Sequence, residues 1–320
     1  MKRSIRKMSM LLALFLLVQA LVGSTCVEAA NGLVSRNGKY YYYVNSQPVK
    51  NRWMTVYIPV NGNYVVRRFY FSSNGSACTG AVTINGSIYI FNNQGALVRS
   101  SVNRLFAIDG NVYCPDQNGK AQTNCWLLVN NHLYYAQRNG VIARNMTYQG
   151  ITIRNGVAQA GLARNLKILC LSLLGQGTKN SDTSLRKLLA SWAFLMNRNR
   201  FRYVDMALPN FNNRYWAKSN AYSMLLTRKG DAFGFACAFA ALASACGYQP
   251  YVIVGKVYSS EDVSLDHCWV RIGSRYFDPE GQFSGWNIGT TFGATTYTPP
   301  ATSVKRVILF ETGALQPFAN

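Results

Sequence analysis

A histidine and an aspartate near the carboxyl end have the residue types and spacing that acyl-transfer chemistry requires. His267 stands two residues before Trp269 in a strand-like stretch, and Asp278 follows after a short turn at Gly273-Ser274. Neighbouring antiparallel strands would bring the Asp278 carboxylate within reach of the His267 imidazole. An imidazole oriented by a carboxylate is the general base that activates a thiol or hydroxyl nucleophile.

A buried helix expected just upstream offers a strong local field for such a nucleophile. Asp231 has the residue type of a helix N-cap, the apolar run after it predicts a central helix over 232–245, and Gly247 is suited to end that helix. The amino-terminal turn of a helix lowers the pKa of a thiol through the helix dipole. The residue in that turn is Ala232, whose methyl group cannot attack an acyl carbon.

Three segments together resemble the core of the bacterial transglutaminase-like family: KGDAFGFACAFAALASACG at 229–247, His-Cys-Trp at 267–269, and Asp278-Pro279. The first motif of that family runs K-G-D-C-x-x-[YF]-A, with the cysteine opening the buried helix. The resemblance implies a papain-like fold with a Cys-His-Asp triad, in which His267 is the base and Asp278 orients it. It also implies that Ala232 occupies the position of the family nucleophile.

Cys237 is the alternative nucleophile, and it defines a different class of function. It lies five residues beyond Ala232 on the same predicted helix, a net rotation of about 140° and an axial shift of about 7.5 Å, so we expect it to face away from Ala232. Cys268 directly follows His267 and is expected on the opposite face of the strand. If the motif is displaced by one helical turn, Cys237, His267 and Asp278 form an active triad.

Residues 31–158 are dominated by repeated turn signals. Asn-Gly or Asp-Gly pairs recur every 24 residues, an Asn-Asn pair follows 21 residues later, and alternating aromatic and β-branched residues come after each pair. The pairs are Asn37-Gly38, Asn61-Gly62, Asn85-Gly86, Asp109-Gly110 and Asn130-Asn131. Such pairs between apolar runs indicate β-hairpins, and hairpins this small must stack to bury a face.

These tandem aromatic hairpins resemble the cell-wall-binding repeats of secreted Gram-positive proteins, a group that includes choline- and glucan-binding modules. Whether the aromatic rings bind a ligand or only pack the solenoid stays open. After residue 158 the pattern becomes helical, with helices expected over 162–174, 185–196, 220–226 and 232–245, and strands over 251–254, 267–272, 276–277 and 304–310. The predicted fold is therefore an all-β hairpin-repeat solenoid at 31–158 followed by an α+β transglutaminase-like (papain-like) domain at 162–320.

The amino-terminal residues and the charge predict export and a polyanionic partner. Residues 1–30 have the pattern of a signal peptide, because basic residues precede an apolar run at 8–22 that is shorter than a bilayer span. The chain after residue 30 carries 29 Lys and Arg against 11 Asp and Glu, and so basic a surface attracts wall polymers. No helix-turn-helix, zinc or RNA-binding signature is present, so we expect no nucleic acid. No metal or cofactor is expected either.

Together these features predict a protein of the cell wall or cell surface, secreted and without a membrane span after signal cleavage. We expect the repeats to hold a wall polymer or surface glycan. We expect the carboxyl-terminal cleft to bind peptide or protein as a transglutaminase-like pseudoenzyme. The alternative is an active cysteine acyltransferase, amidase or peptidase that uses Cys237. Whether the domain is an enzyme depends on which residue faces His267.

Overall fold

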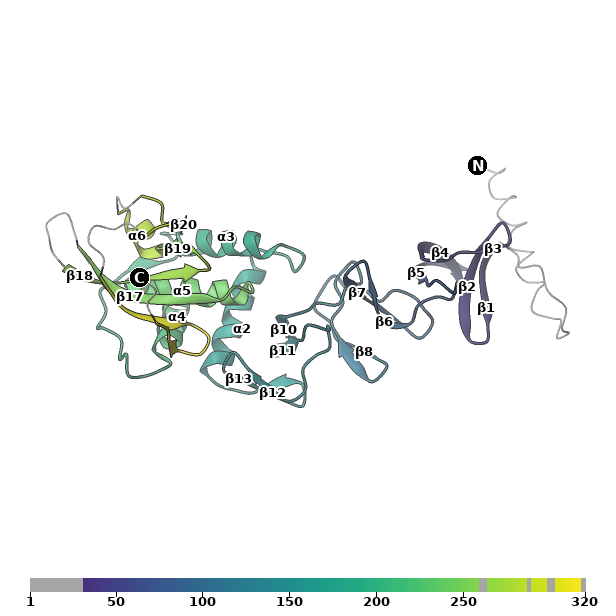
Figure 1. Cartoon of the computed structure of the whole chain (residues 1–320), viewed down its shortest axis with the longest axis horizontal. Coiled ribbons are helices and arrows are strands. Elements are labelled where there is room, and N and C mark those ends of the chain that lie inside the picture. Colours follow the sequence, from purple (N-terminus) through teal and green to yellow (C-terminus); the bar gives the residue numbers. More distant parts are fainter. Residues whose placement is uncertain (1–30, 259–263, 287–288, 298–302, 318–320) are drawn as a thin grey trace. The chain divides into compact units, whose positions relative to one another are not determined.

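The computed structural model describes residues 31–258, 264–286, 289–297 and 303–317. The signal peptide predicted at residues 1–30 lies outside these ranges. Internal contacts divide the chain into two compact units, of which the first ends at Cys78 and the second begins at Thr79. Both units begin with antiparallel β-hairpins (Figure 1).

The first unit consists of two antiparallel structures joined by aromatic packing. A three-stranded sheet contains β1 (Gly32–Arg36), β2 (Lys39–Val44) and β3 (Gln47–Pro48), and a long hairpin contains β4 (Arg52–Val60) and β5 (Asn63–Phe71). The rings of Phe69 and Phe71 on β5 have their centres 6.4 and 6.2 Å from those of Tyr40 and Tyr42 on β2. Phe69 and Phe71 are buried, so this contact is the core of the unit.

The second unit begins with further hairpins. Their strands are β6 (Gly80–Ile84), β7 (Ser87–Phe91), β8 (Phe106–Ile108), β9 (Asn111–Tyr113), β10 (Cys125–Val129), β11 (His132–Ala136), β12 (Met146–Tyr148), β13 (Ile151–Arg154) and β14 (Val157–Ala158). The turns have the predicted chemistry, since Asn85 and Gly86 have φ of 47° and 74°, and Asp109 and Gly110 have 49° and 76°. Two successive positive φ values make the type I′ turn, which Asx and Gly residues adopt with little strain. The hairpins predicted at all five turn pairs are confirmed.

The loop after one hairpin pairs with the hairpin before it. The N–H of Ala121 donates to the carbonyl of Ile88 and that of Ile142 to the carbonyl of Val112, both at 2.8 Å. Within the first unit, the N–H of Ala77 donates to the carbonyl of Tyr40 at 2.7 Å. These bonds satisfy strand edges that would otherwise be open. They give successive hairpins the stacked arrangement expected of a repeat.

Helices and a sheet make up the rest of the second unit. The helices are α2 (Leu162–Gly175), α3 (Ser184–Leu195), α4 (Trp216–Thr227), α5 (Ala232–Ala245) and α6 (Pro279–Ser284). An antiparallel sheet has the strand order β20 (Phe292–Ala294), β19 (Arg275–Phe277), β18 (Ser264–Ile272), β17 (Pro250–Tyr258), β21 (Ser303–Leu309) and β22 (Ala314–Leu315). β15 (Arg202–Tyr203) and β16 (Lys229–Gly230) form a short parallel pair. The predicted α+β arrangement of helices followed by an antiparallel sheet is present, with α6 as an addition.

Helix α5 is the centre of this part of the fold. Every residue from Ala232 to Ser244 is buried, as expected for a helix that is apolar on all sides. It contacts α2, α3 and α4 as well as β17 and β18, and Figure 1 shows it running beside those two strands. Small residues such as Ala236 and Ala240 allow this close approach. The helix therefore fixes its own amino terminus relative to the sheet.

A buried polar network connects the last hairpins to the helices. The ammonium of Lys218 on α4 donates to the carbonyls of Glu311, at 2.6 Å, and Gln149, at 3.4 Å. Lys167 on α2 donates to the hydroxyl of Ser244 at 2.6 Å and lies 3.6 Å from the Glu311 carboxylate. Burial lowers the pKa of Lys218, and the two carbonyls compensate for the lost water. The network joins α2, α4, α5, the β12–β13 turn and the segment after β21.

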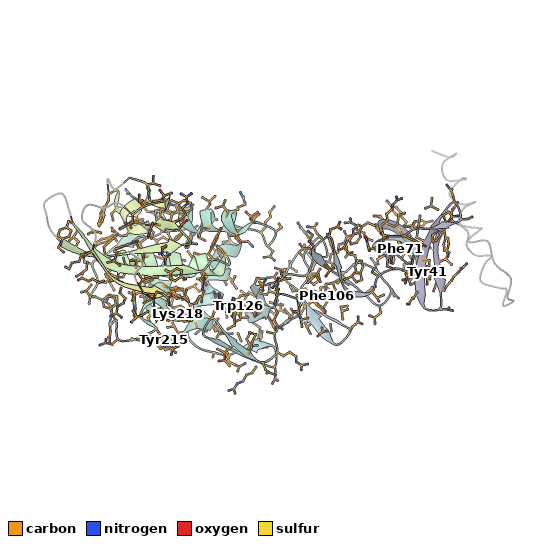
Figure 2. All side chains as sticks on the ribbon, viewed as in Figure 1. Tyr41, Phe71, Phe106, Trp126, Tyr215 and Lys218 are labelled. Atoms are coloured by element: carbon orange, nitrogen blue, oxygen red, sulfur yellow. The ribbon has the colours of Figure 1, made fainter. Side chains whose placement is uncertain are left out.

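Secondary structure changes where the sequence predicts a boundary, because β14 ends at Ala158 and α2 begins at Leu162. The packing nevertheless continues across this point. Trp126 and its hairpin neighbours share a buried cluster with Ile168 and Leu171 of α2, and Figure 2 marks Trp126 beside the helices. The division into domains at 31–158 and 162–320 therefore stays a prediction. Within the described residues, no helix has the length and apolarity to cross a membrane.

Candidate functional site

The amino terminus of α5 carries a methyl group where the family resemblance places a nucleophile. Asp231 caps the helix, since its carboxylate accepts a 3.0 Å hydrogen bond from the N–H of Gly234. Ala232 is the first helical residue and is buried. Burial raises the pKa of the Asp231 carboxyl, and the backbone N–H groups of the helix start oppose that rise. The turn thus has the geometry of an anion-stabilising helix start without a thiol.

The predicted histidine–aspartate pair is brought together in the structure. Nε2 of His267 on β18 lies 2.9 Å from Oδ2 of Asp278, which directly follows β19, and both side chains are buried. The hydroxyl of Tyr297 donates to the same oxygen at 2.7 Å, and the N–H of Gly281 donates to Oδ1 at 2.9 Å. An ionised carboxylate only accepts hydrogen bonds, so Nε2 carries the proton in this pair. Asp278 therefore orients the imidazole and also caps α6.

The hydrogen bonds around Asp278 outweigh the effect of its burial. Burial by itself would raise the pKa of the Asp278 carboxyl. The charge and hydrogen bond of His267, together with the donors from Gly281 and Tyr297, lower this pKa below its ordinary value. Burial and the Asp278 charge raise the pKa of the Tyr297 hydroxyl, so Tyr297 remains a donor at neutral pH. Asp278 is thus the ionised member of the group.

The second ring nitrogen of His267 faces another carboxylate. Nδ1 lies 3.7 Å from Oε2 of Glu280, a buried residue of α6 whose carboxylate also accepts a hydrogen bond from Ser284. Burial raises the pKa of the Glu280 carboxyl, and the charges of Asp278 and Asp231 add to that rise. Glu280 is therefore within electrostatic reach of both His267 and the cap of α5. Nδ1, the nitrogen that would accept a proton from a nucleophile, therefore faces the Glu280 carboxyl group.

Aromatic rings and a glycine hold His267 in place. The Trp286 ring stacks on the imidazole with a centre-to-centre distance of 4.8 Å, and the rings of Trp269 and Tyr297 stack at 4.3 Å. Gly255 is the β17 residue paired with His267. A Cβ at Gly255 would overlap the carbonyl oxygen of Ser303 and come within 2.7 Å of the Trp269 ring. The close packing of Trp269 thus requires glycine at this position.

The alternative nucleophile lies on the other face of β18. Cys237 and Cys268 are fully buried in the cluster that surrounds α5, whereas Trp269 belongs to a separate cluster with Ile253. His267 lies 6.1 Å from Trp269, ring centre to ring centre, and so shares its face. Burial, followed by a hydrogen bond with the Cys237 thiol, raises the pKa of Cys268 well above its ordinary value. The structure therefore pairs Cys237 with Cys268 and brings His267 together with Asp278.

Sequence reasoning missed Glu280, Tyr297 and Trp286. It treated Asp278-Pro279 as the end of a strand, although Asp at the N-cap with Pro at the first helical position is a signal for a helix start. That signal would have predicted α6 and placed Glu280 in its first turn. Tyr297 and Trp286 come from loops, and no local pattern predicts which residue of a loop returns to a site.

Among the hairpins, three aromatic rings form a compact cluster. The ring centres of Trp126 and Tyr135 are 5.1 Å apart, those of Tyr135 and Tyr148 are 4.4 Å apart, and the Trp126 indole N–H donates to Gln149 at 2.6 Å. A cage for a quaternary ammonium needs the cation between the ring faces. These rings contact one another, so their packing stabilises the junction with α2.

Comparisons with known proteins add a partial likeness. No protein-family model matches the chain, and no curated protein matches it. Choline binding protein F from Streptococcus pneumoniae is 26% identical over 41% of this chain and 41% of that chain, with a TM-score of 0.30. CbpJ from Streptococcus pneumoniae TIGR4 is 21% identical over 38% of this chain and 50% of that chain, also at 0.30.

The modular Cpl-1 endolysin, solved in complex with a peptidoglycan analogue, is 18% identical over 43% of this chain and 40% of that chain, with a TM-score of 0.30. The chain thus spans about half the length, or less, of these structures. At TM-scores this low the likeness carries no argument about the activity or ligand of this protein.

Proposed function

We propose that this chain is an exported, wall-associated protein in which the hairpins bind a wall polymer and the helical part is a transglutaminase-like module without its nucleophile. In this proposal the helical part binds peptide or polymer and forms no acyl-enzyme. The observation that carries the proposal is Ala232, a buried methyl group at the start of α5 where the resemblance expects a nucleophile, in a chain whose His267 has Glu280 beside its second ring nitrogen.

Charge supports the wall-binding part of the proposal. Residues 31–160 carry twelve Lys and Arg and two Asp, so the hairpin region attracts polyanions over a range set by ionic strength. Several of its aromatic side chains are exposed, including Tyr57 and Tyr64. Exposed rings on a hairpin are suited to contact sugar rings, because both surfaces are flat and partly apolar.

Burial supports the loss of covalent catalysis. Cys237 contacts Cys268 inside the core and lies on the face of β18 opposite His267. A thiol that is buried away from the base cannot transfer its proton to the imidazole. The alternative, an active acyltransferase, amidase or peptidase, would require Cys237 to leave this position.

An activity assay separates the two functions. The chain from residue 31 onward is incubated with glutamine-containing peptides and a primary amine, and released ammonia and amide product are measured for the wild type and for Cys237→Ser. We expect no turnover above background in either protein. Turnover in the wild type that disappears in Cys237→Ser would replace the binding proposal with the enzyme.

A sedimentation assay tests wall binding. The same protein is mixed with purified Gram-positive cell walls at about 50 mM and about 500 mM salt. We expect co-sedimentation at the lower salt and weaker binding at the higher salt, because screening shortens the range of the charges. Protein that stays in the supernatant at both concentrations would refute the proposed association.

A further inference from the structure

The long hairpin of the first unit has two faces with different environments. β4 and β5 are paired over nine residues each, from Arg52↔Phe71 to Val60↔Asn63. Side chains of paired strands alternate between the faces, so each cross-strand pair belongs to one face. At about 3.3 Å per residue the paired length is about 30 Å. Such a length is large for a repeat whose other hairpins pair over three to five residues.

One face of this hairpin is the buried face. Val56, Phe69 and Phe71 point to it and are 8%, 2% and 0% exposed. The two phenylalanine rings contact Tyr40 and Tyr42 of β2, as described for the core of the unit. The part of this face from Val56 to Phe71 is therefore used by the fold, whereas Val60 near the tip is exposed.

The opposite face, here called the outer face, is half-buried at Trp53 and Tyr70 and exposed from Thr55 to the tip. Its cross-strand pairs are Trp53↔Tyr70, Thr55↔Arg68, Tyr57↔Val66 and Pro59↔Tyr64. Tyr57 is 67% exposed, Tyr64 is 48% exposed and Val66 is 42% exposed. The guanidinium of Arg68 lies 4.4 Å from the centre of the Trp53 ring. Exposed aromatic and aliphatic groups gathered on one rigid surface indicate a binding site.

The charge of the first unit determines which ligand fits this face. Residues 31–78 contain no Asp or Glu and six cations, Arg36, Lys39, Lys50, Arg52, Arg67 and Arg68. Arg68 lies within the outer face, and Arg52 and Arg67 lie on the same two strands. Because Arg52 and Arg67 pair with residues of the other face, an anionic ligand on the outer face meets Arg68 and no carboxylate from this unit.

We propose that the outer face binds an anionic polysaccharide in an extended form. Its sugar rings contact Tyr57 and Tyr64, and its acidic groups pair with Arg68. This inference rests on the proposed wall association and adds the class of polymer and the surface that holds it. The apolar face of a sugar ring and the face of an aromatic ring exclude water when they stack. An arginine on the same face supplies directed bonds to carboxylate or phosphate groups.

Two features favour a polysaccharide over a lipid surface. The aromatic residues are spread along the strands, and the turn at the tip, Asn61-Gly62, is polar. A hairpin that enters a bilayer would carry its apolar groups at the tip, where they reach the acyl chains. The row of aromatic side chains along the strands instead matches a ligand that runs parallel to them.

Three soluble probes test the inference with the chain from residue 31 onward. Polygalacturonate carries sugar rings and carboxylates, polyglutamate carries carboxylates alone, and dextran carries sugar rings alone. We expect affinity in the order polygalacturonate, polyglutamate, dextran. The double variant Tyr57→Ala/Tyr64→Ala is expected to weaken polygalacturonate binding about tenfold or more, since aromatic anchors commonly contribute about 1 kcal/mol each or more. It should leave polyglutamate binding unchanged.

Matched variants elsewhere in the chain serve as controls. Tyr215→Ala removes a tyrosine that is 45% exposed on the second unit, and we expect no change in binding of any probe. Arg68→Gln should weaken binding of both charged probes, whereas Arg186→Gln removes an exposed cation of α3 and should change that binding less. Because all five substituted side chains are at the surface, the variants should fold normally, which circular dichroism checks.

The outcomes separate this inference from the proposed function. Two results would overturn the polysaccharide-binding face and leave wall association intact. In the first, the wild type binds walls but prefers polyglutamate or dextran. In the second, the double variant binds polygalacturonate as the wild type does. Preferential binding to phosphatidylglycerol vesicles or to an oligothymidylate, lost in the double variant, would assign the face to a different partner and also overturn it. Loss of wall binding in the wild type would overturn the proposed function itself.

Discussion

Restoring a thiol to the start of α5 tests where the site lies. The variant Ala232→Cys is made together with Cys78→Ser, because Cys78 is the half-exposed native thiol of the first unit. The helix dipole stabilises a thiolate in the first turn, where thiol pKa values fall to about 7 or lower. The capping carboxylate of Asp231 and the nearby Glu280 oppose part of this effect.

The pKa values of the native thiols set the expected difference in reaction rate. Burial raises the pKa of Cys246 to about 11 and those of Cys125 and Cys170 to about 12. At pH 7 a thiol of pKa about 7 is ionised about 5,000 times more than one of pKa about 11. Its thiolate is a weaker nucleophile, by about 60-fold for a Brønsted slope of about 0.45. We therefore expect the new thiol to react with a small aromatic disulfide about 100 times faster than Cys246.

The rate is measured against pH, because the midpoint reports the thiol pKa independently of access. Ala245→Cys, at the opposite end of the same helix, is the matched control, and the dipole there has the opposite sign. We expect a pKa below about 8.5 for Ala232→Cys and not for Ala245→Cys. Adding Glu280→Gln should lower the first pKa further, and adding His267→Ala should raise it. Equal pKa values for the two helix ends would refute the placement of the site at Ala232.

Three further predictions concern stability. Asp278 has a lowered pKa in the folded state, so its contribution to stability is present above about pH 4 and is lost as the pH falls through the folded pKa. Asp278→Asn should therefore reduce the free energy of unfolding by about 2 kcal/mol at pH 7. Urea titrations in which this loss of stability does not shrink below about pH 4 would contradict the prediction. Trp126→Ala should lower the free energy of unfolding by about 3 kcal/mol or more, as measured by thermal unfolding. The control Val102→Ala, at an exposed position, should leave it almost unchanged. Gly255→Ala should lower the free energy of unfolding by about 2 kcal/mol or more, because the added Cβ would overlap Ser303 and Trp269. Gly175→Ala is the control, since a Cβ there has no atom within contact distance. Equal melting temperatures for the two variants would exclude the clash.

Local patterns in the sequence determined the hairpins and the central helix. Asn-Gly and Asp-Gly pairs adopt positive φ more easily than other residues, so each pair predicted a turn that the structure contains at the same position. Asp231, the apolar run after it and Gly247 likewise predicted α5 with its exact ends. The start of α3 was predicted one residue late, at 185, because Ser181, Asp182 and Thr183 all have the residue type of an N-cap; Thr183 caps the helix by accepting the N–H of Arg186.

The pair His267 and Asp278 was also predictable, since a short turn between two strands fixes which residues become neighbours. What only the tertiary structure decided is the environment of that pair. Glu280 reaches Nδ1 of His267 because α6 folds back against α5, with the rings of Phe283 and Phe235 only 4.5 Å apart.

Tyr297 reaches Asp278 from a segment nineteen residues further along the chain. The junction of hairpins and helices depends on contacts of the same kind, such as that of Lys218 with Glu311 across 93 residues. Turn and helix signals act over a few neighbouring residues, whereas these contacts depend on how distant elements pack. The sequence by itself therefore predicts the elements, and the packing decides which groups meet at the site.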